Sequence, residues 1–437
     1  MKEILKPDAT LQKLLPKAQP RPGTKYVPSQ FAVPFAYKDR QFVFHTLTKQ
    51  CVETELPASV KAGEGYDDLI TAQFLVPEDK DECAYYGSIS ALMRLHGRKK
   101  GIAQYIILPT TGCNACCVYC FEENRKPVTM TPEIIEQTIR FILDTHAEGE
   151  VEIEWFGGEP LLCPDIIDRI SEGLRDAGIS YRSSMISNGS PITPEIIQKM
   201  TGLWNLKKIQ VSMDGAEQDY RFRKRYYADR DQYRSVMNAI SRMSEAGIEV
   251  SIRCNVDEEN WDRIPQFLDD LKTGIPDKQN VGLFFAPLNA ARLSDRDTVL
   301  WKKIVNVRPL IREAGFKPME ADGLKLQFRT FHCMADSDSA VIDSDGTLHA
   351  CNEFPEGSRY GDIVNGVTDA AAKQAFCRTD RIREKCRKCP YLPDCTGFAS
   401  CPVQDRHCRE VRELITLYDL RSLIDKADED RIRREEP

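Results

Sequence analysis

Short apolar runs of strand length alternate with amphipathic stretches of helical period from residue 103 onward. Thr131 followed by Pro132 marks the start of one helix, and Gly247 marks the end of another. Repeated strand and helix units predict a parallel sheet with helices outside it, here an open or partial (β/α)6 barrel of the α/β class. In such folds the functional residues lie beyond the carboxyl ends of the strands. The predicted strands are 104–108, 151–156, 181–187, 208–213, 249–255 and 281–286.

The residues ahead of this repeat predict a small α+β unit. Residues 41–47 alternate as a strand does, and residues 51–55 can return beside them as a hairpin. Apolar residues at three- and four-residue spacing then predict helices around 57–75 and 80–95. The Lys- and Pro-rich residues before this unit include few apolar positions, so we expect a loosely ordered entry segment there.

The last part of the chain changes character, because after about residue 326 it is rich in Cys and short of periodic pattern. We expect metal rather than a large core to hold it, and we expect the charged final stretch to fray. The expected divisions are an entry segment at 1–26, a small N-terminal domain at 27–102, the barrel at 103–320, a Cys-rich domain at 321–425 and a charged tail at 426–437.

Composition narrows the class of protein. The chain has no run of roughly 18 uncharged apolar residues and no apolar signal-peptide core after Met1, so we expect a cytoplasmic location and no membrane contact. A formal net charge of −7, from 60 basic and 67 acidic residues, argues against nucleic acid as a partner. The 16 Cys cannot be a disulfide framework in a reducing compartment, which leaves metal binding or catalysis.

Four of these Cys lie between Cys113 and Cys120, directly after the first predicted strand. Cys113, Cys117 and Cys120 have C-x3-C-x2-C spacing, and three thiolates on one short loop can hold three corners of a 4Fe-4S cubane. The fourth iron would stay open to a chelate such as the amine and carboxylate of an amino acid. Cys116 is then a bystander. The alternative is a structural zinc loop, although such a site wants four closed ligands.

Polar residues also follow the other predicted strands. Gly157 and Gly158 allow a ligand to approach the backbone closely, and Glu159 offers a carboxylate to a cationic amine. Hydroxyl, amide and carboxylate groups suit a ribose, and Arg suits a carboxylate in a bidentate pair. Each residue alone can be read as a polar loop cap, but their recurrence at successive strand ends predicts one shared site. The strand-end set is Ser187, Asn188, Ser212, Asp214, Arg253 and Asn255.

Together the Cys triplet, the Gly-Gly-Glu-Pro motif at 157–160 and the strand-end set resemble the radical SAM superfamily over roughly residues 103–290. The resemblance implies S-adenosylmethionine (SAM) as cosubstrate and a core 4Fe-4S cluster on the triplet. It names no catalytic residue. The implied SAM contacts are Glu159 to the amino group, Ser187, Ser212 and Asp214 near the ribose or methionine, Arg253 to the carboxylate and Tyr119 to the adenine, with Gly157, Gly158, Asn188 and Asn255 completing the site.

A second Cys signature follows the barrel. A hairpin turn signal at 343–346 lies between Cys333 and Cys351, and C-x2-C-x5-C spacing begins at Cys386. This pattern is similar to the SPASM domain, which carries auxiliary 4Fe-4S clusters in radical SAM enzymes that modify peptides, so the resemblance implies three clusters in all. The implied auxiliary sets are Cys333, Cys351 and Cys401 for one cluster and Cys386, Cys389, Cys395 and Cys408 for the other.

The auxiliary pattern departs from the family in three places. Five residues rather than three separate Cys395 from Cys401, the final gap before Cys408 is short, and no Cys lies just before Cys333. One auxiliary cluster would therefore have an open iron unless Cys377 closes it. A zinc ribbon is the alternative for the Cys from 386 to 408.

The N-terminal hairpin and helices, in front of such a pair of domains, resemble the recognition domain with which peptide maturases grip a leader peptide by strand addition. The resemblance implies a maturase of a ribosomally made precursor peptide. In such an enzyme a 5′-deoxyadenosyl radical takes a hydrogen and a crosslink forms, with a Cys thioether as the first expectation. A reductant such as flavodoxin or ferredoxin is a further implied partner. Carbon–carbon crosslinking, formylglycine formation as in anaerobic sulfatase maturation, and a plain iron–sulfur electron carrier stay open.

Overall fold

Two compact units make up the chain. One consists of Met1–Arg98, Asp322–Cys333 and Arg378–Pro437, and the other of Lys99–Ala321 and Met334–Cys377. The expected Cys-rich domain is thus divided between them. The computed structural model describes residues 2–15, 17–97, 100–123, 125–228, 231–288, 297–319, 324, 326–328, 335, 337–353, 355–376, 382, 384–394 and 409–435.

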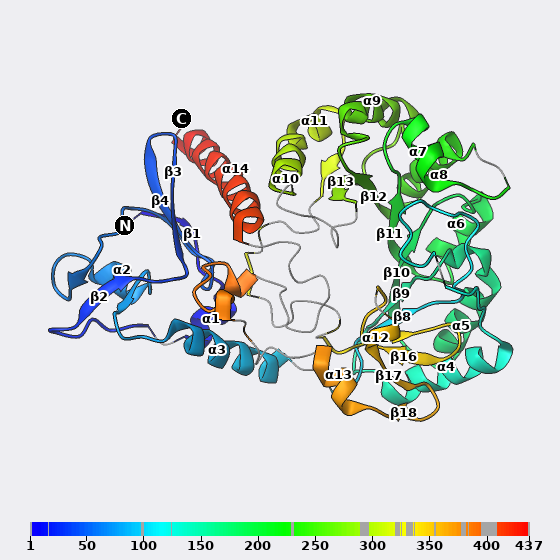
Figure 1. Cartoon of the computed structure of the whole chain (residues 1–437), viewed down its shortest axis with the longest axis horizontal. Coiled ribbons are helices and arrows are strands. Elements are labelled where there is room, and N and C mark those ends of the chain that lie inside the picture. Colours follow the sequence, from blue (N-terminus) through cyan, green and yellow to red (C-terminus); the bar gives the residue numbers. More distant parts are fainter. Residues whose placement is uncertain are drawn as a thin grey trace. The chain divides into compact units, whose positions relative to one another are not determined.

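Six parallel strands form the barrel sheet of the second unit (Figure 1). Neighbours in the sheet follow the order of the sequence, and each pair is parallel. The predicted α/β partial barrel is confirmed, and the strands lie close to their predicted bounds. They are β8 (Gln104–Ile107), β9 (Val151–Trp155), β10 (Tyr181–Ser187), β11 (Leu206–Ser212), β12 (Glu249–Val256) and β13 (Val281–Pro287).

Helices cover the outer side of this sheet (Figure 1). α4 begins where Thr131 accepts a hydrogen bond from the Ile134 amide, with Pro132 in the first turn. Its buried side chains, such as Ile135 and Ile142, face the sheet, and each apolar side chain buried in this way contributes about 1.5–3 kcal/mol. The helices are α4 (Pro132–Thr145), α5 (Pro164–Asp176), α6 (Pro194–Thr201), α7 (Glu217–Lys224), α8 (Tyr233–Glu245) and α9 (Ile264–Gly274).

Beyond the barrel the chain returns to its first strand. β15 (Ser339–Ile342) pairs with β8 in parallel, and β16 (Thr347–His349) pairs with β15 in antiparallel. The predicted hairpin at 343–346 is confirmed, and Gly346 has the positive φ of 82° that its turn requires. The remaining elements of this unit are α10 (Asp297–Asn306), α11 (Arg308–Glu313), β14 (Lys317–Pro318), α12 (Pro355–Ser358), β17 (Arg359–Asp362), β18 (Gly366–Val367) and α13 (Ala370–Phe376).

The first unit is built on two small antiparallel sheets, of order β1-β5-β4-β3 and β6-β2-β7. The predicted hairpin is confirmed by β4 and β5, in which Val43 lies opposite Val52, and the helix expected at 80–95 is confirmed by α3. The elements are β1 (Lys2–Leu5), α1 (Ala9–Leu14), β2 (Lys25–Pro28), β3 (Ala32–Tyr37), β4 (Arg40–His45), β5 (Cys51–Glu53), β6 (Val60–Lys61), α2 (Asp67–Thr71), β7 (Leu75–Pro77), α3 (Glu82–Gly97) and α14 (Arg409–Glu435).

Two expectations for the start of this unit are wrong. Residues 57–75 do not form one helix, because Gly63 and Gly65 adopt positive φ angles and divide the stretch between β6 and α2. The entry segment is ordered as β1 and α1. It is held because Leu11 is buried and the Asp8 carboxylate accepts a hydrogen bond of 2.8 Å from the Leu11 amide.

The expectation of a frayed tail is also wrong for residues 426–435, which continue α14. The charged residues of this helix find partners on the N-terminal sheet: the Arg40 guanidinium lies 2.7 Å from Asp428, and the Tyr37 hydroxyl donates to Asp425 at 2.8 Å. Leu420 and Ile424 pack against the apolar face of that sheet. The helix is therefore part of the same folded body as the first fifty residues.

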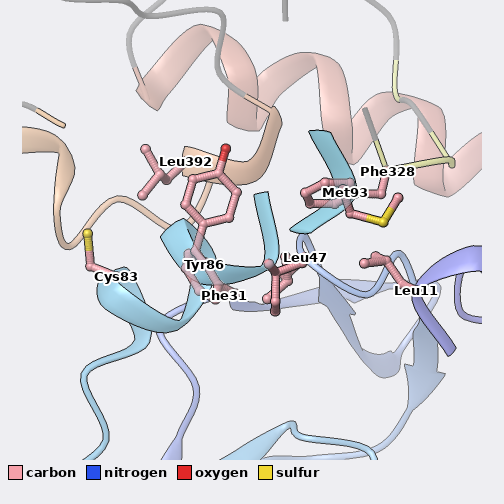
Figure 2. Packing of buried hydrophobic residues seen from close by; sticks show 9 residues of the cluster. Leu11, Phe31, Leu47, Cys83, Tyr86, Met93, Phe328 and Leu392 are labelled. Carbon is pink, nitrogen blue, oxygen red and sulfur yellow. The ribbon is translucent and has the colours of Figure 1, made fainter. Parts of the chain in front are cut away.

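A second apolar cluster joins the Cys-rich segment to the N-terminal domain. Figure 2 shows Phe31, Leu47 and Tyr86 packed with Leu392, and Cys386 is partly buried against this cluster. The Thr46 hydroxyl donates to the carbonyl of Pro390. Cys386 and Cys389 thus lie on a segment that packs against the N-terminal domain. Among the described residues, no helix has the length and apolar character needed to span a bilayer.

Candidate functional site

The loop that carries the Cys triplet leaves the end of β8 and is pinned at its base by two threonines. The Thr110 hydroxyl donates to the carbonyl of Val128 at 3.0 Å, and the Thr111 hydroxyl donates to that of Lys126 at 2.9 Å. Thr110 also accepts a hydrogen bond of 3.0 Å from the Gly112 amide. Both hydroxyl groups therefore fix where the loop starts relative to the strand.

The three triplet thiols share one environment, and Cys116 does not. Cys113, Cys117 and Cys120 are partly buried, whereas Cys116 is exposed. Burial raises the pKa of the Cys113 thiol to about 11, and Cys117 and Cys120 are close enough to add to that rise. Three mutually interacting soft donors on one loop fit a 4Fe-4S cubane. In the described part of the chain, no three Cys, His, Asp or Glu side chains already stand in a metal-binding arrangement.

The end of α7 holds the other side of this loop. The Cys116 amide donates to the carbonyl of Arg225, and the Val118 amide donates to that of Arg223, both at 3.0 Å. In return the Tyr227 amide donates to the carbonyl of Asn114 at 3.0 Å. The Cys loop is therefore paired by backbone hydrogen bonds with residues 223–227, which the sequence did not mark as part of the site.

The two glycines after β9 lie against the backbone of the Cys loop. A Cβ atom on Gly157 would meet the carbonyl oxygen of Thr110 at 2.2 Å, and one on Gly158 would meet that of Gly112 at 2.4 Å. The Glu159 amide then donates to the Gly112 carbonyl at 3.0 Å. The glycines thus serve the approach of one protein loop to another, which places Glu159 beside the triplet.

We expect Gly158→Ala to displace the Cys loop, because the new methyl group meets backbone rather than a side chain that can rotate. Overpacking of this kind costs about 1–3 kcal/mol of unfolding free energy. Iron retained per chain after desalting and the thermal unfolding midpoint should both fall. Gly357→Ala is the matched control, since nothing lies within 4 Å of its added Cβ. Equal iron content in the two variants would contradict this role of Gly158.

Glu159 is fully buried and ties β9 to β10. Its carboxylate accepts hydrogen bonds from the Ser187 hydroxyl at 2.9 Å, from the Asn188 amide at 2.7 Å and from the Leu161 amide at 3.2 Å. Burial raises the pKa of Glu159 to about 7 against these hydrogen bonds. The Asn188 side chain extends the network to the Asn114 amide oxygen at 2.8 Å, and it lies 3.9 Å from the Cys113 sulfur. Three predicted site residues therefore meet beside the first Cys.

A second buried network centres on Asp214, just past the end of β11. Its carboxylate accepts hydrogen bonds from the Asn255 side chain at 2.8 Å and from the Tyr119 hydroxyl, and the Lys224 ammonium lies 3.7 Å away. Burial opposes the charge of Lys224, but Tyr119 and Asp214 raise its pKa well above the usual range. Because Tyr119 belongs to the Cys loop, this network joins that loop to β11 and β12.

The two remaining strand-end residues lie side by side. Ser212 is opposite Arg253 in the β11–β12 register, and the Arg253 Nε donates to the Asn255 side-chain oxygen at 3.1 Å. Both side chains keep partial exposure. Arg253 is thus a cation near the buried network, and among the described residues only its Nε is engaged in a hydrogen bond.

Sequence reasoning missed Lys224 and Asn260. The Asn260 side chain donates to the backbone carbonyls of Asp214 and Asn255 at 3.1 and 3.0 Å, so it fixes the loop that presents Asp214. Lys224 is 3% exposed, and a lysine is rarely buried to this extent unless it has an ion-pair partner, which here is Asp214. The basic run at 223–225 is the signal in the sequence, but nothing in its pattern shows that Arg223 and Lys224 are the two residues that are buried.

The auxiliary Cys sets are only partly within the described residues. Cys351 follows β16 in the second unit, while Cys386 and Cys389 lie in the first unit, with the Cys389 amide donating to the Cys386 carbonyl at 3.0 Å. These three are partly buried. The other assigned ligands and the alternative closing residue lie outside the described residues: Cys333, Cys377, Cys395, Cys401 and Cys408. The auxiliary assignments stay predictions.

The region that contains this site is similar to known proteins. Residues 107–271 match the model of the radical SAM superfamily. An AdoMet-dependent heme synthase from Methanosarcina barkeri is 31% identical over 141 residues, which are 32% of this chain and 36% of that protein. The chain thus spans about a third of the length of this curated relative.

Two solved structures share the fold at low sequence identity. The first is native anSMEcpe with bound AdoMet and Cp18Cys peptide, with a TM-score of 0.59 and 17% identity over 75% of this chain and 99% of that one. The second is Streptococcus suis SuiB bound to the precursor peptide SuiA, with a TM-score of 0.53 and 15% identity over 86% and 96%. The family implies SAM and a 4Fe-4S cluster as cofactors. Residues 107–271 of the chain therefore form a radical SAM domain, and the chain has a fold like that of anSMEcpe and SuiB.

Proposed function

We propose that this protein is a maturase of a ribosomally made precursor peptide and that it forms a crosslink, with a Cys thioether as the first candidate. The observation that carries the proposal is the joining of the Cys loop to two strand-end networks. One passes through Glu159 and Asn188, and the other through Tyr119 and Asp214. An electron carrier needs no such polar set beside its cluster, and an enzyme that binds an amino-acid chelate does.

Different residues of the site would hold the core cluster and the different groups of SAM. Cys113, Cys117 and Cys120 would hold the core cluster, which when bound and reduced supplies the electron that cleaves SAM to methionine and a 5′-deoxyadenosyl radical. Arg253, whose Nη nitrogens bond to none of the described residues, would bind a carboxylate in the bidentate manner that Arg favours. Asp214 is oriented by Asn255 and Tyr119 from opposite sides, so it offers a fixed acceptor for hydroxyl groups.

The buried surroundings support radical chemistry. Glu159 and Asp214 are fully buried, and their hydrogen bonds come from side chains or amides of neighbouring strands. Groups held in this way keep their orientation without solvent reorganisation. A reactive carbon radical needs such a dry and fixed site, because mobile solvent or side chains would offer unwanted hydrogens.

Thioether formation from a thiol and a C–H bond releases two hydrogen atoms in all. One leaves as a hydrogen atom on 5′-deoxyadenosine, and the other leaves as a proton and an electron, so an electron acceptor is required. We assign that role to the clusters that the auxiliary Cys sets, including Cys351, Cys386 and Cys389, would hold. The peptides held by anSMEcpe and SuiB support a peptide substrate, since both proteins share this fold over most of their length.

The test uses purified, iron-loaded protein with SAM and dithionite. We expect release of 5′-deoxyadenosine, which an iron–sulfur electron carrier would not produce. With a precursor peptide encoded next to the gene, we expect a product lighter by two hydrogens. Loss of one alkylatable thiol per crosslink marks a thioether, whereas retention of all thiols marks carbon–carbon coupling. No change in mass or thiols of any neighbouring peptide, despite SAM cleavage, would contradict the peptide proposal.

A further inference from the structure

The four-stranded sheet of the first unit has two edges to which an extended peptide could add. β3 forms one edge of the β1-β5-β4-β3 sheet, and β1 occupies the other. Strand addition needs backbone amides and carbonyls that point outward from an edge. Whether each edge meets that need follows from the hydrogen-bond register.

The β3 edge is blunted by a proline. The Thr46 amide donates to the Phe31 carbonyl at 2.9 Å, which sets residue 31 as a hydrogen-bonded partner of β4. Bonding alternates along an antiparallel pair, so residues 33 and 35 also point toward β4, while residues 32, 34 and 36 point outward. Residue 34 is Pro34, which has no amide hydrogen, and the Ala32 amide already donates to Ser29. Natural sheets use an edge proline to prevent pairing.

The β5 edge has the donors that β3 lacks. The His45 amide donates to the Gln50 carbonyl at 2.8 Å, and the Thr54 amide donates to that of Gln41 at 3.0 Å. Residues 50, 52 and 54 therefore face β4, and Cys51 and Glu53 present their backbone groups to the other side. This extendable edge is covered by the chain's own residues 2–5, which run antiparallel to β5.

β1 is weakly held, and the residues that follow it are anchored. It makes three residue pairs, with a register shift between Glu3 and Leu5, and its ion pair joins an exposed Lys2 to a partly exposed Glu53. Exposed pairs of this kind contribute little to stability. By contrast the Asp8 amide donates to the Thr48 carbonyl at 2.9 Å, and Leu11 is buried. The four residues of β1 can therefore leave the edge while α1 stays in place.

We propose that β1 is a built-in occupant of the leader-binding edge and that a precursor's leader segment binds by displacing it from β5. This inference rests on the proposed function. A tethered strand competes at high effective concentration, so leader affinity is lowered by the fraction of time that β1 covers the edge. Peptide binding thus requires a leader that pairs with β5 more strongly than β1 does, which is four residues long and bulged.

The seated strand shows what chemistry the edge accepts. Ile4 and Leu5 are half-buried against the cluster of Phe35, Phe42 and Phe44, and Lys2 lies opposite Glu53. The matching partner is an extended segment with two adjacent aliphatic residues and a cation two positions before them. A flat polar strand would gain backbone hydrogen bonds but would leave the apolar patch open to water.

The probe is a fluorescein-labelled peptide with the sequence of residues 1–8, and the protein is the full chain with residues 2–6 deleted. We expect the probe to bind the deletion variant at least about tenfold more tightly than the intact chain, because the tethered competitor is gone. A probe in which Ile4→Asp and Leu5→Asp are made together should bind neither protein. Equal binding to both proteins, or no binding to a deletion variant that keeps its circular dichroism spectrum, would overturn the proposal.

Three further measurements test this inference separately from the proposed function. A precursor peptide that the intact enzyme modifies should displace the probe from the deletion variant; modification without displacement overturns the shared edge and leaves the maturase assignment intact. Pro34→Thr restores a donor on the β3 edge and should leave precursor affinity unchanged. Tighter precursor binding to that variant would move the leader to β3. An intact chain that is dimeric, and monomeric once residues 2–6 are deleted, would assign β1 to a second copy and overturn the proposal.

Discussion

Replacing any one of Cys113, Cys117 and Cys120 with Ala should reduce release of 5′-deoxyadenosine to the background of a reaction without enzyme. In the proposed assignment each thiolate would hold one iron corner, and a cubane with two protein ligands is not retained against desalting. The three thiols interact with one another in a partly buried loop. Iron per chain, together with 5′-deoxyadenosine measured by chromatography, tests the prediction.

Cys116→Ala is the matched control, because Cys116 belongs to the same loop but is exposed, and its backbone amide bonds to Arg225 whichever side chain it carries. This variant should keep its core iron and at least about half of its activity, since surface substitutions usually change stability by less than about 0.5 kcal/mol. Equal loss in the Cys116 variant would show that the triplet has been misassigned.

The barrel and much of its site could be predicted because one rule connects them. Parallel strands end at a common edge, so polar residues that directly follow strands are close in space even when far apart in sequence. Glu159, Ser187 and Asn188 follow two neighbouring strands and meet in one hydrogen-bond network. The same rule brought Asp214 and Asn255 together at 2.8 Å.

Lys224 could not be predicted by that rule, because it lies at the end of a helix rather than of a strand. Its burial depends on Tyr119 and Asp214, and local patterns do not register such distant partners. The same limit explains the terminal segments. β1 finds its partner at residues 51–53, and the charges of α14 find theirs at Lys38 and Arg40. Each terminal segment looks polar and irregular in the sequence. It is ordered only by its distant partner in the N-terminal sheet.

This packing also bears on how the leader-binding role can be tested. Removing residues 27–102 would take away Phe31 and Tyr86, which pack with Leu392, and the sheet face that covers Leu420. The segment with Cys386 would lose its support, so such a deletion would disturb an expected cluster site along with any peptide site. Deleting residues 2–6 leaves the apolar cluster around Tyr86 and Leu392 intact. From the cluster around Leu420 it removes only the half-buried Ile4 and Leu5. The deletion of residues 2–6 therefore tests peptide binding without disturbing the segment that carries Cys386.

The second large effect is expected at Lys224. Lys224→Met keeps the length of the side chain but removes the cation 3.7 Å from the Asp214 carboxylate, which is fully buried. Breaking a buried ion pair from one side costs about 3–5 kcal/mol, because the remaining charge is left without compensation. The buried Asp214 carboxylate would then lack its compensating cation, and its hydrogen bond from Tyr119 would reorganise. We expect a lower unfolding midpoint and at least about a tenfold loss of SAM affinity.

Two comparisons separate these effects. Lys207→Met is the matched control, since Lys207 is an exposed lysine on β11, and it should change neither quantity. Combining Lys224→Met with Asp214→Asn removes both charges, so the double variant should recover part of the lost stability, as a neutral pair does in place of a broken one. SAM affinity should stay low, because Asn cannot supply the carboxylate that Tyr119 and Asn255 orient. Equilibrium dialysis with SAM and thermal unfolding of the unsubstituted chain, Lys224→Met, Asp214→Asn and the double variant complete the cycle. If SAM affinity returned with stability in the double variant, Lys224 would serve folding alone and Asp214 would not contact SAM.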